Sequence, residues 1–107
     1  MGQQSLDGHD LTGLRAAYTR KVTEELPKRA RQGDSWPIRD DHCFARVVLD
    51  AVFQDAWYDH VDGSPAYKQL SAAELREAIA IADRMLASGA PAVSALNRQS
   101  LRWREEA

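Results

Sequence analysis

Residues 40–57, DDHCFARVVLDAVFQDAW, are dense in apolar side chains and contain neither Gly nor Pro. Strict alternation is absent, so the segment favours an α-helix over a strand, although its adjacent valines would also suit a strand. The apolar positions cover most of a helix circumference, which is typical of a central, mostly buried helix. Asp40 or Asp41 can cap the N-terminus, and we expect the helix to run as far as Trp57.

His42, Arg46 and Asp50 follow one another at intervals of four and therefore form one polar line along this helix. One interpretation is a chemical site, in which Arg46 holds an anion, His42 transfers a proton and Asp50 pairs with Arg46. The other, which we favour, is that the polar line is the solvent-facing edge of a mostly buried helix. Whether the line meets water, a cavity or another chain decides between them.

Three further helices are predicted around the central one. Apolar residues at spacings of three and four predict an amphipathic helix over residues 11–26, which Pro27 should end. Ser71 and Glu74 form an S-x-x-E capping box for a third helix, and Gly89 is placed to stop it. A fourth helix should hold Pro91 in its first turn. Its expected apolar face is Val93, Leu96, Leu101 and Trp103, and its expected outer side chains are Arg98, Arg102 and Arg104.

These patterns predict an all-α fold, a small single-domain bundle of about four helices with a mostly buried second helix. The single helical domain is expected over residues 10–107, after a flexible lead-in of residues 1–9 that is polar and shows no period. A chain of 107 residues with 44% hydrophobic and 28% charged residues lies in the ordinary globular range, which favours one domain.

The composition also narrows the classes of function. A net charge of −2 argues against a general nucleic-acid coat or a binder of acidic membranes. We expect a cytoplasmic protein without a membrane span, because no secretory segment and no apolar run of about 18 residues occurs. The single cysteine, Cys43, excludes an intramolecular disulfide and a cysteine-based zinc cluster, and beside Phe44 it is interpreted as a core residue. No recognised metal spacing is found, and neither a metal nor a cofactor is predicted.

Charge is distributed unevenly along the chain. Residues 15–31 carry six Lys or Arg against two Glu, whereas the acidic residues of 34–62 are seven Asp. One interpretation is a surface for nucleic acid or an acidic partner. We favour the other, in which the two segments complement each other inside the fold or across a homodimer. Neither a recognition helix nor aromatic interleaving accompanies the basic residues.

Trp36, Trp57, Tyr58 and Tyr67 flank the central helix and its two loops. Such rings line ligand grooves and partner surfaces, and they also close the ends of small bundles. We therefore predict a non-enzymatic binding protein that takes a protein partner or self-associates as a homo-oligomer. These aromatics would be its anchors, with Arg46 and the Arg-rich last helix at the rim.

Two alternatives stay open. One is a small-ligand-binding protein or enzyme centred on the polar line, with Tyr58 and His60 nearby and a small anionic ligand held by Arg46. The chain has no glycine-rich phosphate loop, nucleophile elbow or paired catalytic carboxylates that would support catalysis. The other, which we favour least, is nucleic-acid binding through the basic first helix.

Overall fold

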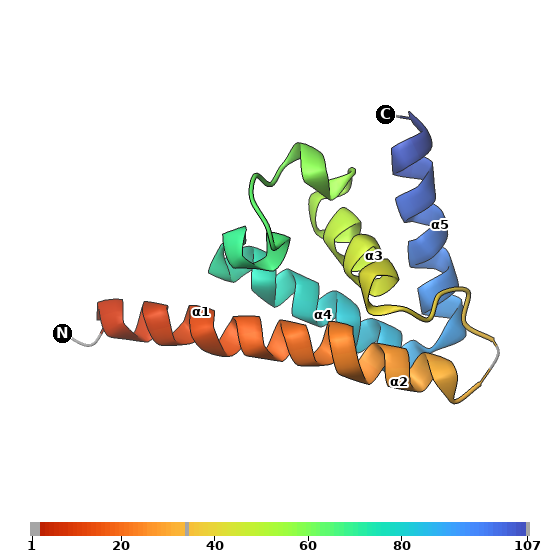
Figure 1. The fold of residues 1–107 in the computed structure, drawn as a ribbon, viewed down its shortest axis with the longest axis horizontal. Coiled ribbons are helices and arrows are strands. Elements are labelled where there is room, and N and C mark those ends of the chain that lie inside the picture. Colours follow the sequence, from red (N-terminus) through yellow and green to blue (C-terminus); the bar gives the residue numbers. More distant parts are fainter. Residues whose placement is uncertain (1–2, 34, 107) are drawn as a thin grey trace.

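The computed structural model describes residues 3–33 and 35–106, and these form an all-α bundle (Figure 1). The prediction of a small helical bundle is therefore confirmed. Its α-helices are α1 (Gln3–Arg20), α2 (Leu26–Arg31), α3 (Asp41–Phe53), α4 (Ala72–Ser88) and α5 (Ala90–Glu106). A π-helical segment, η1 (Lys21–Glu25), joins α1 to α2, and two 3₁₀ turns, η2 (Trp57–Asp59) and η3 (Ala66–Gln69), lie between α3 and α4. Within the described residues, no helix has the length and apolarity needed to cross a bilayer.

The helix α3 lies at the centre of the bundle, as its sequence predicts. It packs against α4, α5 and η1, while α4 lies alongside the long rod formed by α1, η1 and α2 (Figure 1). Phe44, Val47 and Val48 of α3 are fully buried, and they join a core to which every long helix contributes. The apolar run that covers most of the α3 circumference is therefore explained by neighbours on several sides.

The first helix is longer than its sequence pattern indicated. Helical backbone begins at Gln3, within the segment predicted to be a flexible lead-in, of which residues 1 and 2 lie outside the described range. It also continues past Pro27, which the sequence predicted to be its end. The π-helical turn at η1 precedes this proline and shifts the hydrogen-bond register, with the Leu26 N–H bonded to the Lys21 carbonyl. A wider turn accommodates a residue that lacks an N–H and crowds the preceding turn.

The helix α3 ends at Phe53, four residues before the predicted end at Trp57. Gln54 takes a left-handed conformation with φ of 55°, which turns the chain out of the helix. Side-chain carboxylates then accept two of the following N–H groups: Asp55 accepts from Ala56, and Asp50 accepts from Trp57. The chain therefore leaves the helix without leaving these donors unpaired.

The signals around α4 are confirmed. Ser71 and Glu74 form the complete capping box, with each side chain bonded to the other residue's N–H. Gly89 ends the helix with a positive φ of 74°. On α5 the apolar face differs from the prediction, because Leu101 is exposed and Ser100 is fully buried in its place.

Candidate functional site

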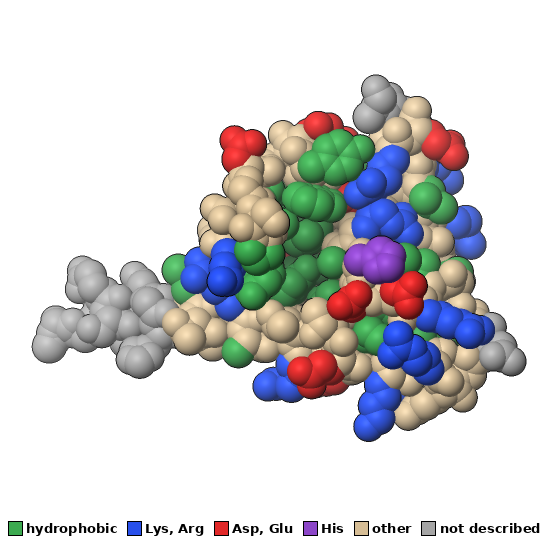
Figure 2. All heavy atoms as spheres, viewed as in Figure 1, with side chains coloured by type: hydrophobic (Ala, Val, Ile, Leu, Met, Phe, Trp, Pro, Cys, Tyr) green, Lys and Arg blue, Asp and Glu red, His purple; other side chains and the backbone are tan. Residues whose placement is uncertain are grey.

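An apolar groove of about 270 Å³ lies between the α1–η1 rod, α3 and the loop that contains η3. Figure 2 shows hydrophobic side chains gathered in a hollow on this face, with basic side chains on both sides of it. No carboxylate occurs among the twelve residues that line the groove. They are Tyr18, Thr19, Val22, Thr23, His42, Ala45, Arg46, Leu49, Trp57, Pro65, Ala66 and Tyr67.

Four of the predicted site residues line this groove together: His42, Arg46, Trp57 and Tyr67. The ring of Tyr67 stacks on that of Tyr18, with 5.7 Å between centroids, and this stack forms part of one wall. Burial raises the pKa of the Tyr18 hydroxyl well above its ordinary value, and the nearby Tyr67 raises it further. The groove thus combines aromatic walls with two side chains of the polar line.

The third member of the polar line, Asp50, is fully buried and does not line the groove. It accepts hydrogen bonds from the Ser100 hydroxyl at 2.6 Å, from Arg104 Nε at 2.8 Å and from the Trp57 N–H at 2.9 Å. The paired carboxylate raises the pKa of Arg104. Every oxygen of Asp50 is therefore engaged in holding α5 and the start of η2 against α3.

Arg46 connects this buried network to the groove. Its two terminal nitrogens donate to Ser100 at 2.9 Å and to Asn97 at 2.8 Å, both on α5. The Ser100 hydroxyl thus lies between Arg46 and Asp50 and bonds to both. A guanidinium has five N–H donors, so Arg46 is fixed by α5 and still has donors to offer to the groove.

The interpretation of the polar line as a solvent-facing edge is wrong at Asp50. His42 is exposed, Arg46 is half-buried, and Asp50 is fully buried against α5, so the line passes from water into an interhelical contact. The placement of Arg104 on the outside of α5 is also wrong, because this side chain is only 27% exposed and pairs with Asp50. A polar residue on a nearly apolar helix can be buried when the facing helix supplies its partners.

The remaining predicted site residues lie outside the groove lining. Trp36 packs edge-on against Phe44 with 5.9 Å between ring centroids. Tyr58, 52% exposed, has the Arg104 guanidinium 5.1 Å from its ring centre. Of the four predicted aromatic anchors, Trp57 and Tyr67 line the groove, and the Tyr58 ring packs edge-on against that of Trp57 at 5.9 Å between centroids.

His60 also lies away from the groove. It stacks on Phe53 and pairs with Asp55 at 3.1 Å. The hydrogen bond from His60 lowers the pKa of the Asp55 carboxyl, and the bond from the Ala56 N–H lowers it further. These contacts stabilise the turn after α3.

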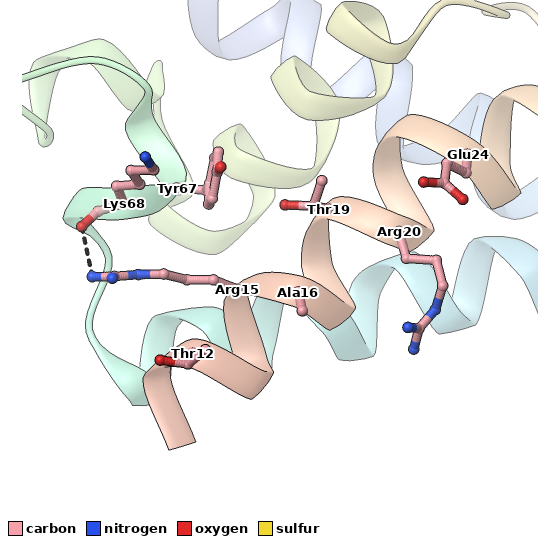
Figure 3. Close-up of a pocket in the computed structure, with 8 residues that line it drawn as sticks. All are labelled: Thr12, Arg15, Ala16, Thr19, Arg20, Glu24, Tyr67 and Lys68. Atoms are coloured by element: carbon pink, nitrogen blue, oxygen red, sulfur yellow. Dashed lines mark hydrogen bonds between the residues drawn. The ribbon is translucent and has the colours of Figure 1, made fainter. Parts of the chain in front are cut away.

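A second hollow, of about 480 Å³, adjoins the groove and shares Thr19 and Tyr67 with it. We call it the cationic hollow; its lining residues are Thr12, Arg15, Ala16, Thr19, Arg20, Glu24, Tyr67 and Lys68. Figure 3 shows Arg15 extending from α1 to the backbone carbonyl of Lys68, to which it donates a hydrogen bond of 2.9 Å. This hollow was not predicted from the sequence, because only the fold brings η3 against α1.

Several residues of the basic segment are paired with acids. Lys21 pairs with Asp83 of α4 at 2.7 Å, and Arg31 contacts Asp40 at 3.7 Å. Arg20 pairs with Glu25 at 3.4 Å. One of these pairs, Arg31 with Asp40, joins the basic segment to the aspartate-rich one as the sequence suggested.

The start of α3 brings together Asp40, His42 and Cys43, whose potential metal-ligand atoms all lie within 4.8 Å of one another. Sequence spacing gave no hint of this cluster. The Arg31 guanidinium lies 3.7 Å from the Asp40 carboxylate, and the N-terminus of α3 carries a partial positive charge. Both oppose a bound cation, so we assign no metal to this cluster.

Comparison with protein-family models, with curated proteins and with solved structures gives no match to this chain. Function must therefore be inferred from the arrangement of its own residues.

Proposed function

We propose that this protein is a non-catalytic binding protein whose binding site is the apolar groove. A partner protein would insert an apolar side chain between the aromatic walls, with Arg46 fixing the position of the segment that carries it. The observation that supports this proposal is the convergence of Trp57, Tyr67 and Arg46 on one groove with no carboxylate in its lining. Tyr, Trp and Arg are the residues most often found at energetically dominant positions of interfaces.

The burial and the hydrogen bonds of the Asp50 carboxylate favour binding over catalysis as the function. Its oxygens already accept from Ser100, Arg104 and the Trp57 backbone, and the residue has no exposed surface. A catalytic acid or base must lie within hydrogen-bond distance of the proton that it transfers. The buried Asp50 carboxylate does not reach a ligand in the groove. His42 is exposed at the rim, where it contacts the Asp41 carboxylate at 3.7 Å. An enzyme built on the polar line is therefore the less favoured alternative.

A protein partner is favoured over a compact small ligand by the shape of the groove and of the hollow beside it. The groove also adjoins the cationic hollow, with which it shares Thr19 and Tyr67. An elongated segment can occupy both hollows, whereas a compact ligand would fill one of them and remain partly exposed.

The test fills the groove from its α3 wall. Ala45 is half-buried in the groove lining, so Ala45→Trp places a large ring in the space proposed for the partner's side chain. The matched control is Ala80→Trp, at an exposed position inside α4. Both variants should keep the wild-type far-ultraviolet circular dichroism spectrum. The ligand is a pool of random 15-residue peptides displayed on phage and selected on the wild-type protein.

Selected peptides should bind Ala45→Trp at least about tenfold more weakly than the wild type, and Ala80→Trp equally well. Peptides that bind Ala45→Trp as tightly as the wild type, or a selection that enriches no peptide, would overturn the proposal. Native mass spectrometry of the purified protein examines self-association in parallel. A dimer that Ala45→Trp dissociates would identify the groove's partner as a second copy of this chain.

A further inference from the structure

We infer that the segment bound in the groove is acidic: it carries carboxylates next to its apolar anchor, and these bind in the adjoining cationic hollow. This inference rests on the proposed function and specifies the partner's chemistry. It follows from three features: the charge of the residues that line the two hollows, the hydrogen-bond partners of the cationic residues, and the two lining residues that the hollows share.

The charge around the two hollows is opposite to that of the whole chain. Their combined lining contains four cationic side chains, Arg15, Arg20, Arg46 and Lys68, and one carboxylate, Glu24. The chain as a whole has a net charge of −2. An excess of positive charge in the lining of an apolar groove and its adjoining hollow attracts acidic partners and disfavours basic ones.

Three of these four cations have no carboxylate partner among the described residues. Arg20 pairs with Glu25, and Figure 3 shows it pointing away from Lys68. Arg15 instead donates to a backbone carbonyl, and Arg46 donates to Ser100 and Asn97. Neutral acceptors position these guanidinium groups without cancelling their charge, so a carboxylate would gain a charge-assisted hydrogen bond at either one.

Arg15 is the better placed of the cations in this hollow. Its Nε is buried and has no hydrogen-bond partner within the described residues. A partly desolvated guanidinium interacts more strongly with a nearby carboxylate than a fully hydrated one does. The bond to the Lys68 carbonyl fixes the Arg15 guanidinium against η3, and the Lys68 side chain lines the same hollow.

The continuity of the hollows sets the order of residues in the partner. The ring of Tyr67 lines both hollows, and Thr19 of α1 lines both from the opposite wall. A segment whose apolar side chain enters the groove therefore has its next residues over Arg15 and Lys68. A helical segment would achieve this with a large apolar residue and an Asp or Glu three or four positions apart.

The first test uses the composition of the selected phage peptides. Peptides that bind the wild-type protein and are lost on Ala45→Trp should be enriched in Asp and Glu over the starting pool, next to a large apolar residue. Enrichment in Lys or Arg, or no acidic enrichment, would overturn the inference and leave the proposed function intact. Peptides insensitive to Ala45→Trp would instead overturn the proposed function.

The second test removes two charges of the cationic hollow and substitutes no residue of the groove lining. The double variant Arg15→Gln with Lys68→Gln is compared with Lys28→Gln with Arg29→Gln, which changes the net charge equally at exposed positions of α2. The probes are the dye 1-anilinonaphthalene-8-sulfonate and its uncharged analogue N-phenyl-1-naphthylamine. The affinity for the anionic dye divided by that for the uncharged analogue isolates the contribution of the anionic group from that of the apolar rings.

That ratio should fall about tenfold in the Arg15 and Lys68 variant and stay at its wild-type value in the control. Equal ratios in both variants would overturn the inference. A 15-residue oligo(dT) tests nucleic acid as the anionic ligand. The inference would also be overturned if the oligonucleotide bound the wild type and Ala45→Trp equally but did not bind the Arg15 and Lys68 variant. The groove would then play no part in binding.

Discussion

Replacing Asp50 by Ala should remove a buried polar contact between α3 and α5. The carboxylate is fully buried and accepts two hydrogen bonds from Arg104, at 2.8 and 3.3 Å, besides those from Ser100 and the Trp57 N–H. Without it, a buried hydroxyl and a part-buried backbone N–H lose their acceptor, and each such loss costs about 1–3 kcal/mol. Removing one partner of a buried ion pair costs about 3–5 kcal/mol in all.

The Arg104 side chain is 27% exposed and can turn partly towards water, so the lower part of this range applies. We expect the free energy of unfolding to fall by about 3–4 kcal/mol, which for a chain of this size lowers the melting temperature by about 12–16 °C. Urea denaturation followed by circular dichroism at 222 nm measures the change by linear extrapolation. The control is Asp62→Ala, an exposed position at which the change should stay within about 0.5 kcal/mol.

A second variant shows whether the network acts as a unit. Ser100→Ala removes the hydroxyl that bonds to both Arg46 and Asp50, and the double variant with Asp50→Ala should lose less stability than the two single losses together. A fall in the free energy of unfolding below about 1 kcal/mol for Asp50→Ala would refute the reasoning, because leaving these four donors without their carboxylate should destabilise the fold by more than that. Additive losses would show that Asp50 and Ser100 stabilise the fold independently.

Three further outcomes are expected. Ser71→Ala breaks the capping box with Glu74 and should cost about 1 kcal/mol in urea denaturation; a change below about 0.3 kcal/mol would show that this cap contributes nothing. Gln54→Gly relieves a left-handed conformation at an exposed helix end and should stabilise the protein by about 0.5–1 kcal/mol, whereas destabilisation would contradict the assigned φ of 55°. The hydrogen bond from His60 lowers the pKa of the Asp55 carboxyl in the folded protein. The stability that this bond contributes is therefore present above the pKa of the carboxyl in the unfolded chain, and it is lost as the pH falls through the pKa of the carboxyl in the folded protein. His60→Ala should therefore move the Asp55 carboxyl titration, followed by NMR, upwards towards its ordinary midpoint, and an unmoved midpoint would show that His60 does not perturb it.

Local signals in the sequence account for much of the fold. The capping box at Ser71, the stop at Gly89 and the apolar run of α3 each act over a few residues, so their effects follow from spacing alone. Predictions failed where a distant contact or a rare backbone geometry intervened. The helix passes Pro27 because a π turn precedes it, and α3 ends before Trp57 because Gln54 turns left-handed and Asp50 takes the Trp57 N–H.

The candidate site was likewise predicted only in part from the sequence. Residue type and spacing singled out His42, Arg46, Trp57 and Tyr67, all of which line the groove. Nothing local distinguished them from Trp36 or Tyr58, which do not line the groove, since an aromatic residue near a helix end is compatible with either position.

The sequence by itself determined that this chain forms an all-α bundle around one apolar helix, because helix periodicity, caps and stops are encoded within a few residues. It also determined that His42, Arg46 and Asp50 share a direction, since a spacing of four fixes their angle around the helix axis. Only the tertiary structure decided what that direction meets: α5 supplies Ser100 and Arg104 to Asp50, and η3 supplies the opposite wall of the groove. Ser100 and Arg104 lie some fifty residues away along the chain from Asp50, and packing alone brings them within hydrogen-bond distance of it.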